Sequence, residues 1–537
     1  MILLLLHRKD EEMVSTKLFS TEVDIINRAG GVAYALSPKQ ALTQYVCMGT
    51  LGNTYYASDV GQLVSILNLS RSEDINSEYI AKLAVYSRTN SWMKNVPVLL
   101  LLVLLNRDAE LFEKIFPVVI DNGEQLRTFC QMIRSGVAGR NSFGAVAKRC
   151  VNLQLNVFGL HKIIQANIGN NPSLKDVIKM THPKPKNEQR EALFSWVIND
   201  GKINPEAYSV LPAGFKKFED LKRDSVNTDR AGFPWGFPDF RYFSSLGLNK
   251  EDWAALAKSM DYMGLRMNLI NLNKHGVFSE PKIVEDIARR ISDRNSIIGS
   301  RQYPYQFLSA YIMGEEVLPP KICNALQDAM EISIENVPII DTNFTHICVD
   351  VSGSMGSPIT GYRKGATSKV TCKMVASLFA TALLRKNPNS CFVYPFDTMV
   401  YETPLNSKDS VMTNVKILNG FGGGGTDCSC VLRTLNKKKV KGDLVILISD
   451  MESWKDTTAY HKGTGVINEF NIYSRRNEKA KLVCMDLQPN KYTQARDNMN
   501  ILNIGGFNDN IFDIVKLFVE NDLSSDHWVD KVEKTEI

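Results

Sequence analysis

The spacing of apolar residues changes near residue 340, and one fold cannot accommodate both patterns. Up to Ile340, apolar residues recur every three or four positions, as in Leu63, Ile66 and Leu67, and that period is typical of amphipathic helices. Gly, Pro and Asn separate these segments, and between Val14 and Ile340 no alternation of apolar and polar residues with period two is visible. We therefore predict an all-helical region of stacked helix pairs, similar to a solenoid but without a crisp repeat period.

The part of the chain after Pro338 has a different pattern. Short apolar runs typical of buried strands alternate there with helical stretches; the runs lie at 345–351, 391–396, 443–449 and 481–486. This alternation predicts an α/β fold with a doubly wound, mostly parallel sheet. The 537 residues exceed the about 100–200 residues of one domain, so we expect more than one domain. The change of pattern separates a helical module at 20–340 from an α/β domain at 341–537, and an N-terminal extension at 1–19 precedes both.

Polar residues follow the predicted strands at the places where open parallel sheets bind ligands. The first strand ends in Asp350, with Ser352 and Ser354 directly after it, and the third ends in Asp450. Thr426 follows a glycine run that lets the backbone approach closely. Hydroxyl and carboxylate oxygens suit a hard divalent cation that stays partly hydrated. The sequence predicts a Mg²⁺ site, with Mn²⁺ as the second choice.

Within this site, each residue has an expected role. Ser352, Ser354 and Thr426 would bind the cation directly, while Asp350 and Asp450 would act directly or through water. One coordination position would stay open for a carboxylate from a partner. Each residue taken singly could instead cap a helix or form a turn, but their occurrence in three separate loops favours the metal site.

The charge balance excludes a uniformly basic nucleic-acid binder. The chain has 63 Lys and Arg against 58 Asp and Glu, a net charge of +5. Residues 101–250 hold 21 basic and 15 acidic residues, so the surplus is concentrated in the predicted helical region. A local basic surface could bind phosphates, although a solvated helix face would also account for it.

Cysteine usage and hydropathy indicate a cytoplasmic protein without a membrane span. The ten cysteines are scattered, with no CxxC pair, which fits a reducing compartment better than a disulfide framework. The apolar run at 1–6 is shorter than the h-region of a signal peptide, and the true start could be Met1 or Met13. The run at 96–105 is about half the length of a membrane span and is expected to form a buried helix.

The metal-site residues resemble those of a known family. Asp350 to Met355, Thr426 and Asp450 are similar to the metal-ion-dependent adhesion site of a von Willebrand factor A domain, a module that usually binds rather than catalyses. The second Asp of aspartyl-phosphate phosphatases is replaced by Ser352, and no GxxxxGK[ST] phosphate loop occurs. We therefore expect no enzymatic activity.

The order of motifs along the whole chain resembles the Ro autoantigen family, in which a helical TROVE module precedes an A domain. The motifs that carry this resemblance lie at 52–56, 86–88 with 93–97, 134–149, 175–185, 273–278, 303–307, 425–429 and 450–452. The resemblance implies a monomeric ring of HEAT-like helical repeats closed by the A domain. It also implies RNA-binding residues, for which we select Arg134, Arg140, Lys148, Arg149, Lys179, His182 and Lys184.

The resemblance further implies a function in the quality control or decay of noncoding RNA. Y RNAs would bind the outer basic surface, single-stranded 3′ ends of misfolded RNAs would enter the central hole, and an exoribonuclease such as polynucleotide phosphorylase would be a partner. The stretch 168–174 lacks the basic residues and the Gly-Trp of the family, which weakens the expectation for Y RNA more than that for misfolded RNA.

Two other functions remain open from the sequence. The A domain could serve a protein-interaction scaffold that clamps an acidic partner through the metal. A metal-dependent hydrolase is a third possibility, but no general base or nucleophile stands out beside the metal residues.

Overall fold

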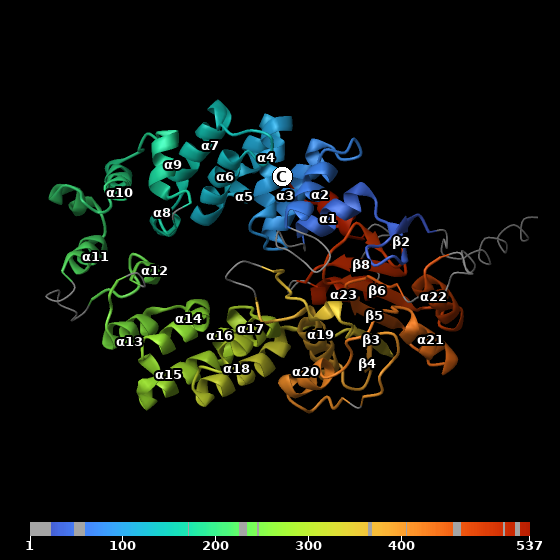
Figure 1. Ribbon diagram of the computed structural model, residues 1–537. Coiled ribbons are helices and arrows are strands. Elements are labelled where there is room, and N and C mark those ends of the chain that lie inside the picture. The colour runs from blue at the N-terminus through green and yellow to red at the C-terminus, as the bar shows by residue number, and fades with distance from the viewer. Residues whose placement is uncertain are drawn as a thin grey trace, which may run out of the picture.

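The computed structural model describes residues 23–537 except 48–58, 170, 225–232, 244–245, 363–367, 404, 455–462, 508–510 and 521–526. The predicted extension at 1–19, both candidate start residues and the motif at 52–56 lie outside these described residues. In Figure 1, helices follow one another along an arc, and both ends of the arc meet a domain built around a sheet.

Helices make up most of the first half of the chain, as predicted. They are α1 (Pro38–Cys47), α2 (Asp59–Leu69), α3 (Ser77–Thr89), α4 (Val96–Arg107), α5 (Ala109–Val119), α6 (Gly123–Ser135), α7 (Gly144–Val157), α8 (Leu160–Ala166), α9 (Leu174–Thr181), α10 (Glu188–Ile198), α11 (Ala213–Arg223), α12 (Phe240–Phe243), α13 (Lys250–Ser259), α14 (Tyr262–Lys274), α15 (Pro281–Ile291), α16 (Arg294–Gly299), α17 (Pro304–Gly314) and α18 (Pro320–Ser333). The apolar run at 96–105 is buried throughout and belongs to α4. No helix in the described part of the chain is long and apolar enough to span a membrane.

The prediction that everything before residue 340 is helical was wrong at the N-terminal end. Strands β1 (Ile25–Ile26) and β2 (Val32–Ala35) form an antiparallel hairpin, and β2 also pairs with β7 (Tyr492–Thr493) near the other end of the chain. Strands this short show no recognisable alternation. Their pairing partner lies more than 450 residues away in the sequence, so no local pattern could reveal it.

The second half contains the predicted doubly wound parallel sheet. Its strands are β3 (Thr345–Asp350), β4 (Cys391–Phe396), β5 (Leu444–Ser449), β6 (Lys481–Asp486) and β8 (Ile501–Gly505), and its helices are α19 (Cys372–Lys386), α20 (Val411–Asn419), α21 (Cys430–Lys437), α22 (Gly465–Arg476), α23 (Ile511–Val519) and α24 (His527–Glu533). All neighbouring strands pair parallel, in the order β4-β3-β5-β6-β8. The carboxyl ends of these strands therefore share one edge of the sheet, and the amino ends share the opposite edge.

Helices cover both faces of this sheet. Alternate residues of the fully buried strand β3 enter different cores: Ile347 and Val349 pack with α19, whereas Cys348 packs with residues of α21 and α22. Burial on both faces explains why the strands are apolar without alternation. All ten cysteines are buried as free thiols.

The two halves of the molecule contact each other at two separate places, so the arc is closed. On one side, the C-terminal helix α24 packs against α1 and α3, where Lys82 Nζ donates to the Glu533 carbonyl at 3.0 Å and Tyr86 lies against Trp528. On the other side, α17 and α18 pack against α19 and α20. The ring of helical repeats closed by an A-type domain is thus the observed architecture (Figure 1).

Candidate metal centre and nucleic-acid interface

The loop after β3 brings three of the predicted metal ligands together. Asp350, Ser352 and Ser354 are all buried. The backbone N–H of Ser352 donates to Asp350 Oδ1 at 2.8 Å, and the hydroxyls of Ser352 and Ser354 lie 3.3 Å apart. Because β3 is a central strand that ends at Asp350, the sheet fixes where these oxygens emerge.

The glycine run is fastened to the same loop. The N–H of Gly423 donates to the Val351 carbonyl at 3.0 Å, and the N–H of Gly353 donates to the Gly424 carbonyl at 3.1 Å. Gly422 has a φ of +85°, and a Cβ built on it would lie 1.9 Å from the Val351 carbonyl oxygen. Only glycine fits this close approach. The loop then leads to Thr426, which is buried next to the segment that follows β5: the N–H of Trp454 donates to the Thr426 carbonyl.

Asp450 completes the set from the end of β5, the strand beside β3. It is fully buried, and its Oδ2 has no hydrogen-bond partner in the described part of the chain. A buried carboxylate oxygen without a partner is costly unless a cation or a proton satisfies it. This orphaned oxygen, together with the hydroxyls of Ser352 and Ser354, fits a hard divalent cation.

The two carboxyls affect each other electrostatically. Burial and, to a smaller extent, the nearby Asp450 carboxylate raise the pKa of Asp350 to about 7, although hydrogen bonds from Ser449 and Ser352 lower it. Burial also raises the pKa of Asp450. A divalent cation between them would favour the ionised form of both.

Several polar groups of this edge were missed in the sequence. The Ser449 hydroxyl donates to Asp350 Oδ2 at 2.5 Å and orients that carboxylate. Glu452 and Asp486 are also buried there, and burial raises the pKa of both. Strand-end Ser449 and Asp486 carried a usable signal, since each closes an apolar run. The candidate site depends on Ser and Thr hydroxyls as well as carboxylates. In the described residues, no group of three or more His, Cys, Asp or Glu side chains is arranged to hold a metal ion.

The N-terminal hairpin reaches this same edge. The N–H of Ala29 donates to Glu452 Oε2 at 3.2 Å, and Asn27 Nδ2 donates to the Ser453 carbonyl at 2.8 Å. Tyr492, on the strand that pairs with β2, donates its hydroxyl to Glu452. The loop that carries Asp450 is therefore held by residues from both ends of the chain.

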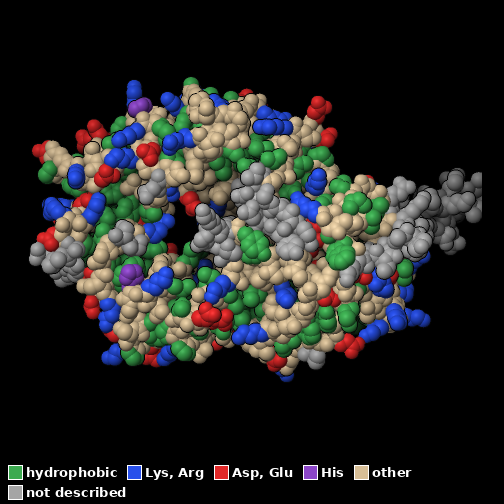
Figure 2. Space-filling model, viewed as in Figure 1, with side chains coloured by type: hydrophobic (Ala, Val, Ile, Leu, Met, Phe, Trp, Pro, Cys, Tyr) green, Lys and Arg blue, Asp and Glu red, His purple; other side chains and the backbone are tan. Residues whose placement is uncertain are grey.

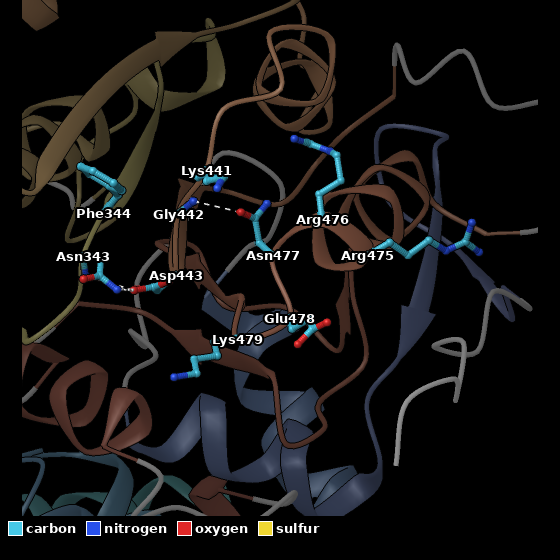
Figure 3. A pocket seen from close by; sticks show the side chains of 10 residues that line it. All are labelled: Asn343, Phe344, Lys441, Gly442, Asp443, Arg475, Arg476, Asn477, Glu478 and Lys479. Carbon is cyan, nitrogen blue, oxygen red and sulfur yellow. Dashed lines mark hydrogen bonds between the residues drawn. The ribbon is translucent and has the colours of Figure 1, made fainter. Parts of the chain in front are cut away.

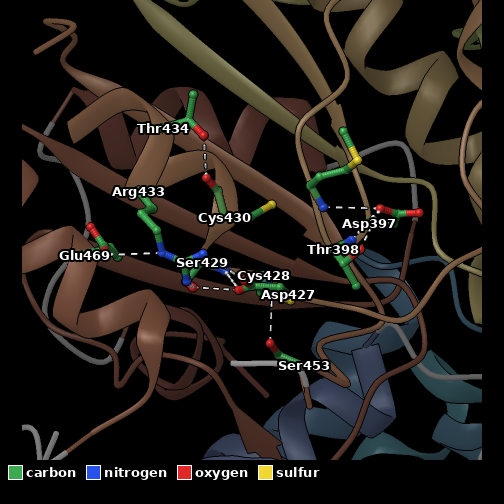
Figure 4. Close-up of polar contacts among 11 residues, drawn as sticks. Asp397, Thr398, Asp427, Cys428, Ser429, Cys430, Arg433, Thr434, Ser453 and Glu469 are labelled. Atoms are coloured by element: carbon green, nitrogen blue, oxygen red, sulfur yellow. Dashed lines mark hydrogen bonds and ion pairs between the residues drawn. The ribbon is translucent and has the colours of Figure 1, made fainter. Parts of the chain in front are cut away.

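Asp427, next to Thr426, has a different role. Its carboxylate accepts the N–H and the hydroxyl of Ser429 at 3.0 and 2.6 Å and forms an ion pair with Arg433 at 3.0 Å (Figure 4). Arg433 also reaches Glu469 on α22. Asp427 thus organises the start of α21 rather than the metal site, although it lies beside Thr426 in the sequence.

Three of the predicted RNA-binding cations lie close together on the helical arc. Arg134 is in the last turn of α6, Lys148 on α7 and Lys179 on α9, and all three are exposed. Arg134 and Lys179 both act on the Asp176 carboxyl and help lower its pKa, after the hydrogen bonds from Ser173. Lys148 lines a surface depression together with Met180. Figure 2 shows Lys and Arg side chains gathered over this part of the arc.

The remaining cations have other contacts. Arg140 donates to the carbonyls of Ser142 and Phe143 and so shapes its own loop. Arg149 forms an ion pair with Glu113. His182 is the residue that follows α9; it has a left-handed φ of +50° and is exposed. Lys184 is exposed as well, in a segment that α7 holds through Asn156 Nδ2, which donates to the Lys184 carbonyl at 3.0 Å.

Comparison with known proteins supports both modules. The model of the Ro60 vWA domain matches residues 345–519, and the model of the TROVE domain matches residues 241–317. The RNA-binding protein RO60 of Deinococcus radiodurans is 24% identical over 462 residues, covering 81% of this chain and 84% of that protein. The protein of the same name from Caenorhabditis elegans is 24% identical over 277 residues, covering 49% of this chain and 40% of that protein.

A solved structure supports the same assignment at the level of the fold. The crystal structure of the Deinococcus radiodurans RO (RSR) protein superposes with a TM-score of 0.65 at 18% identity, covering 91% of this chain and all of that chain. The chain thus matches the TROVE and Ro60 vWA domain models in the expected order, and with its helical arc and closing A-type domain it resembles the Ro family, in which a TROVE module precedes a von Willebrand factor A domain.

Proposed function

We propose that this protein binds RNA in the manner of the Ro family and does not itself catalyse a reaction. The observation that carries the proposal is the presence of both Ro modules in one closed ring, with exposed cations on the helical part. The relatives are named RNA-binding proteins. Arg134, Lys148 and Lys179 have no ion-pair partner among the described residues, so their charge is available for phosphates.

The RNA partners we propose are structured or misfolded noncoding RNAs with single-stranded 3′ ends, and Y RNA where the cell contains it. Unstacked bases and phosphates of single strands can be held without base-specific contacts. The function would be RNA quality control or decay in the cytoplasm, by a monomeric ring that delivers RNA to an exoribonuclease such as polynucleotide phosphorylase.

The A domain would hold Mg²⁺ or Mn²⁺ through Ser352, Ser354 and Thr426, with Asp350 and Asp450 binding directly or through water. The unsatisfied Oδ2 of Asp450 supports this assignment. When bound, the cation would accept one further oxygen ligand, such as a carboxylate from a partner protein. The chain's own residues hold this ligand set in place through the β3 and β5 strand ends and the fastened glycine loop.

Sequencing the RNA that co-purifies with the full chain tests the proposal. We expect enrichment of structured noncoding RNAs that carry extra 3′ nucleotides, and loss of that enrichment in a Lys148→Ala/Lys179→Ala variant. If the recovered RNA mirrors the total RNA of the cell for both proteins, the proposal is wrong.

A pull-down in Mg²⁺ and in chelator, after nuclease treatment, separates RNA binding from a pure scaffold function. The scaffold function predicts that a partner protein is captured in Mg²⁺ but not in chelator, and that capture does not need RNA.

A further inference from the structure

The amino edge of the sheet, opposite the metal edge, carries an open depression of about 540 Å³. Three segments line it, and each precedes a strand of the sheet. They are Asn343 and Phe344 before β3, Lys441, Gly442 and Asp443 before β5, and Arg475, Arg476, Asn477, Glu478 and Lys479 at the end of α22 and before β6 (Figure 3). We call this surface the amino-edge patch.

Cations outnumber acids in the amino-edge patch, four to two. Lys441, Arg475 and Lys479 are exposed and have no ion-pair partner among the described residues. Among the described residues, Arg476 donates to two neutral acceptors, the Asn436 side chain at 2.6 Å and the Val440 carbonyl at 3.4 Å, and its guanidinium lies over the Tyr473 ring. Its charge is therefore oriented but not neutralised.

In the described part of the chain, neither acid of the patch, Asp443 or Glu478, forms an ion pair with these four cations. Asp443 accepts both the N–H and the side-chain amide of Asn343, at 3.0 and 2.7 Å, and so ties down the chain before β3. Exposed Lys437 is the last residue of α21, and exposed Lys439 lies on the loop that leads to Lys441. Basic residues in the last turns of α21 and α22 stabilise those helices through the helix dipole, which would explain their presence without a ligand. Lys439, Lys441 and Lys479 lie outside those turns, so the helix dipole does not explain them.

Exposed aromatic rings lie beside these cations. Phe344 is 41% exposed and Phe392 is 43% exposed, and their ring centroids are 5.9 Å apart. Phe344 lines the depression itself. Exposed aromatics next to unpaired cations are the arrangement that binds single-stranded nucleic acid, in which bases stack on the rings and cations hold the phosphates. An acidic peptide would need the cations but not the rings.

We propose that the amino-edge patch binds single-stranded RNA, as a second surface separate from the cations on α6, α7 and α9. This inference extends the proposed RNA-binding function to the A domain. In Figure 1, α21 and α22 lie at the opposite side of the molecule from α7 and α9. The ligand class is a flexible single strand read without sequence specificity, with one base stacked on Phe344.

Ultraviolet crosslinking of the full chain to a 4-thiouridine-labelled, unstructured oligoribonucleotide tests this placement. We expect crosslinked peptides from the segments around Phe344, 441–443 and 475–479. Crosslinks confined to the helical arc would overturn the inference and leave the proposed function intact.

Affinity measurements with the same oligonucleotide provide the second test. We expect Phe344→Ala to weaken binding about tenfold. Lys441→Glu/Lys479→Glu should also weaken binding. It should reduce the slope of log affinity against log salt by about 1.4, which is ~0.7 for each phosphate that the protein no longer neutralises. The matched control, Lys258→Glu/Lys282→Glu, makes the same charge change on exposed residues of α13 and α15 and should have a smaller effect on both quantities.

Three outcomes contradict the inference. In the first, the patch variants, with unchanged circular dichroism, bind the oligonucleotide like the wild type. In the second, the control variant loses as much affinity as the patch variant, which would show a general charge effect. In the third, polyglutamate or vesicles containing phosphatidylserine bind the patch while the oligonucleotide does not, which would assign it to an acidic protein or a membrane surface. Loss of RNA binding in Lys148→Ala/Lys179→Ala alone tests the proposed function separately.

Discussion

The charged groups at the carboxyl edge of the sheet lie in the interior, whereas those on the helical arc lie on the surface. Asp350 and Asp450 are fully buried, and each depends on a few neighbours for its charge state. Arg134, Lys148 and Lys179 are exposed and lie on helices that contact one another through α9. A buried site is therefore expected to fail when one member is removed, while an exposed surface loses its affinity in small steps.

The largest effect should follow from removing Asp350. We expect Asp350→Ala to abolish binding of Mg²⁺ or Mn²⁺, measured by isothermal titration calorimetry, because the carboxylate and the orientation of the Ser352 N–H are lost together. The control is Asp443→Asn, which changes a carboxylate at the opposite edge of the same sheet. Retained metal affinity in Asp350→Ala would show that this edge is not a metal site.

The glycine loop permits a sharper test of how tightly the metal edge is built. Gly422 and Gly423 both have positive φ, but a Cβ on Gly422 would meet the Val351 carbonyl, whereas a Cβ on Gly423 would meet nothing within 4 Å. We expect Gly423→Ala to cost the about 1–3 kcal/mol of a strained backbone conformation with positive φ, and Gly422→Ala to cost clearly more. Thermal unfolding of both variants measures the difference. Equal losses would contradict the close packing of this loop.

On the helical arc, the effects should be smaller and additive. Lys148→Ala and Lys179→Ala should each weaken RNA binding a few-fold and reduce the salt slope by roughly 0.7–0.9, the value expected when one phosphate is no longer neutralised, measured by fluorescence anisotropy. The free energy of unfolding should change by less than about 0.5 kcal/mol, as for most exposed substitutions. A single substitution that abolished binding would show that this surface is a specific pocket rather than a distributed one.

The smallest effect concerns pH. The pKa of Asp350 rises from 3.8 to about 7 on folding. A carboxyl with a raised folded pKa stabilises the fold fully below its unfolded pKa, and this contribution is lost as pH rises through the folded pKa. In chelator, we therefore expect the contribution of Asp350 to the free energy of unfolding to fall by about 1.4 kcal/mol between about pH 6 and about pH 8.

Asp350→Asn should reduce the fall in the total free energy of unfolding but not remove it, since burial also raises the pKa of Glu452 to about 7. Excess Mg²⁺ should reduce the fall in the wild type, because the cation favours the ionised carboxylates. Chemical denaturation at both pH values gives the comparison. An identical pH dependence in Asp350→Asn and wild type would show that Asp350 does not titrate in this range.

Local patterns in the sequence were sufficient to predict four of the five strands of the sheet, all but β8, and the convergence of Asp350 and Asp450 at its carboxyl edge. The first and third predicted strands were apolar runs followed by Asp350 and Asp450, so these two residues could be placed at one edge. The N-terminal hairpin and the packing of α24 on α1 and α3 could not be predicted, because both depend on contacts between the two ends of the chain. The role of Ser449 was missed because a hydroxyl at a strand end has several ordinary uses.

The cations of the helical module could be predicted as a basic region but not as a surface. Arg134, Lys148 and Lys179 come together because α9 packs against both α6 and α7. Arg140 and Arg149, equally plausible in the sequence, instead contact neighbouring groups of the protein. Which cations are available for RNA is therefore decided by packing and by ion pairs rather than by the order of residues.

The affinity of the full chain for a structured RNA with a single-stranded 3′ tail, compared with the same RNA lacking the tail, tests the central claim most directly. We predict that the tailed RNA binds more tightly, that its affinity falls steeply as salt is raised, and that Lys148→Ala/Lys179→Ala weakens it at every salt concentration. Equal affinity for both RNAs, unchanged by salt and by these substitutions, would contradict the account.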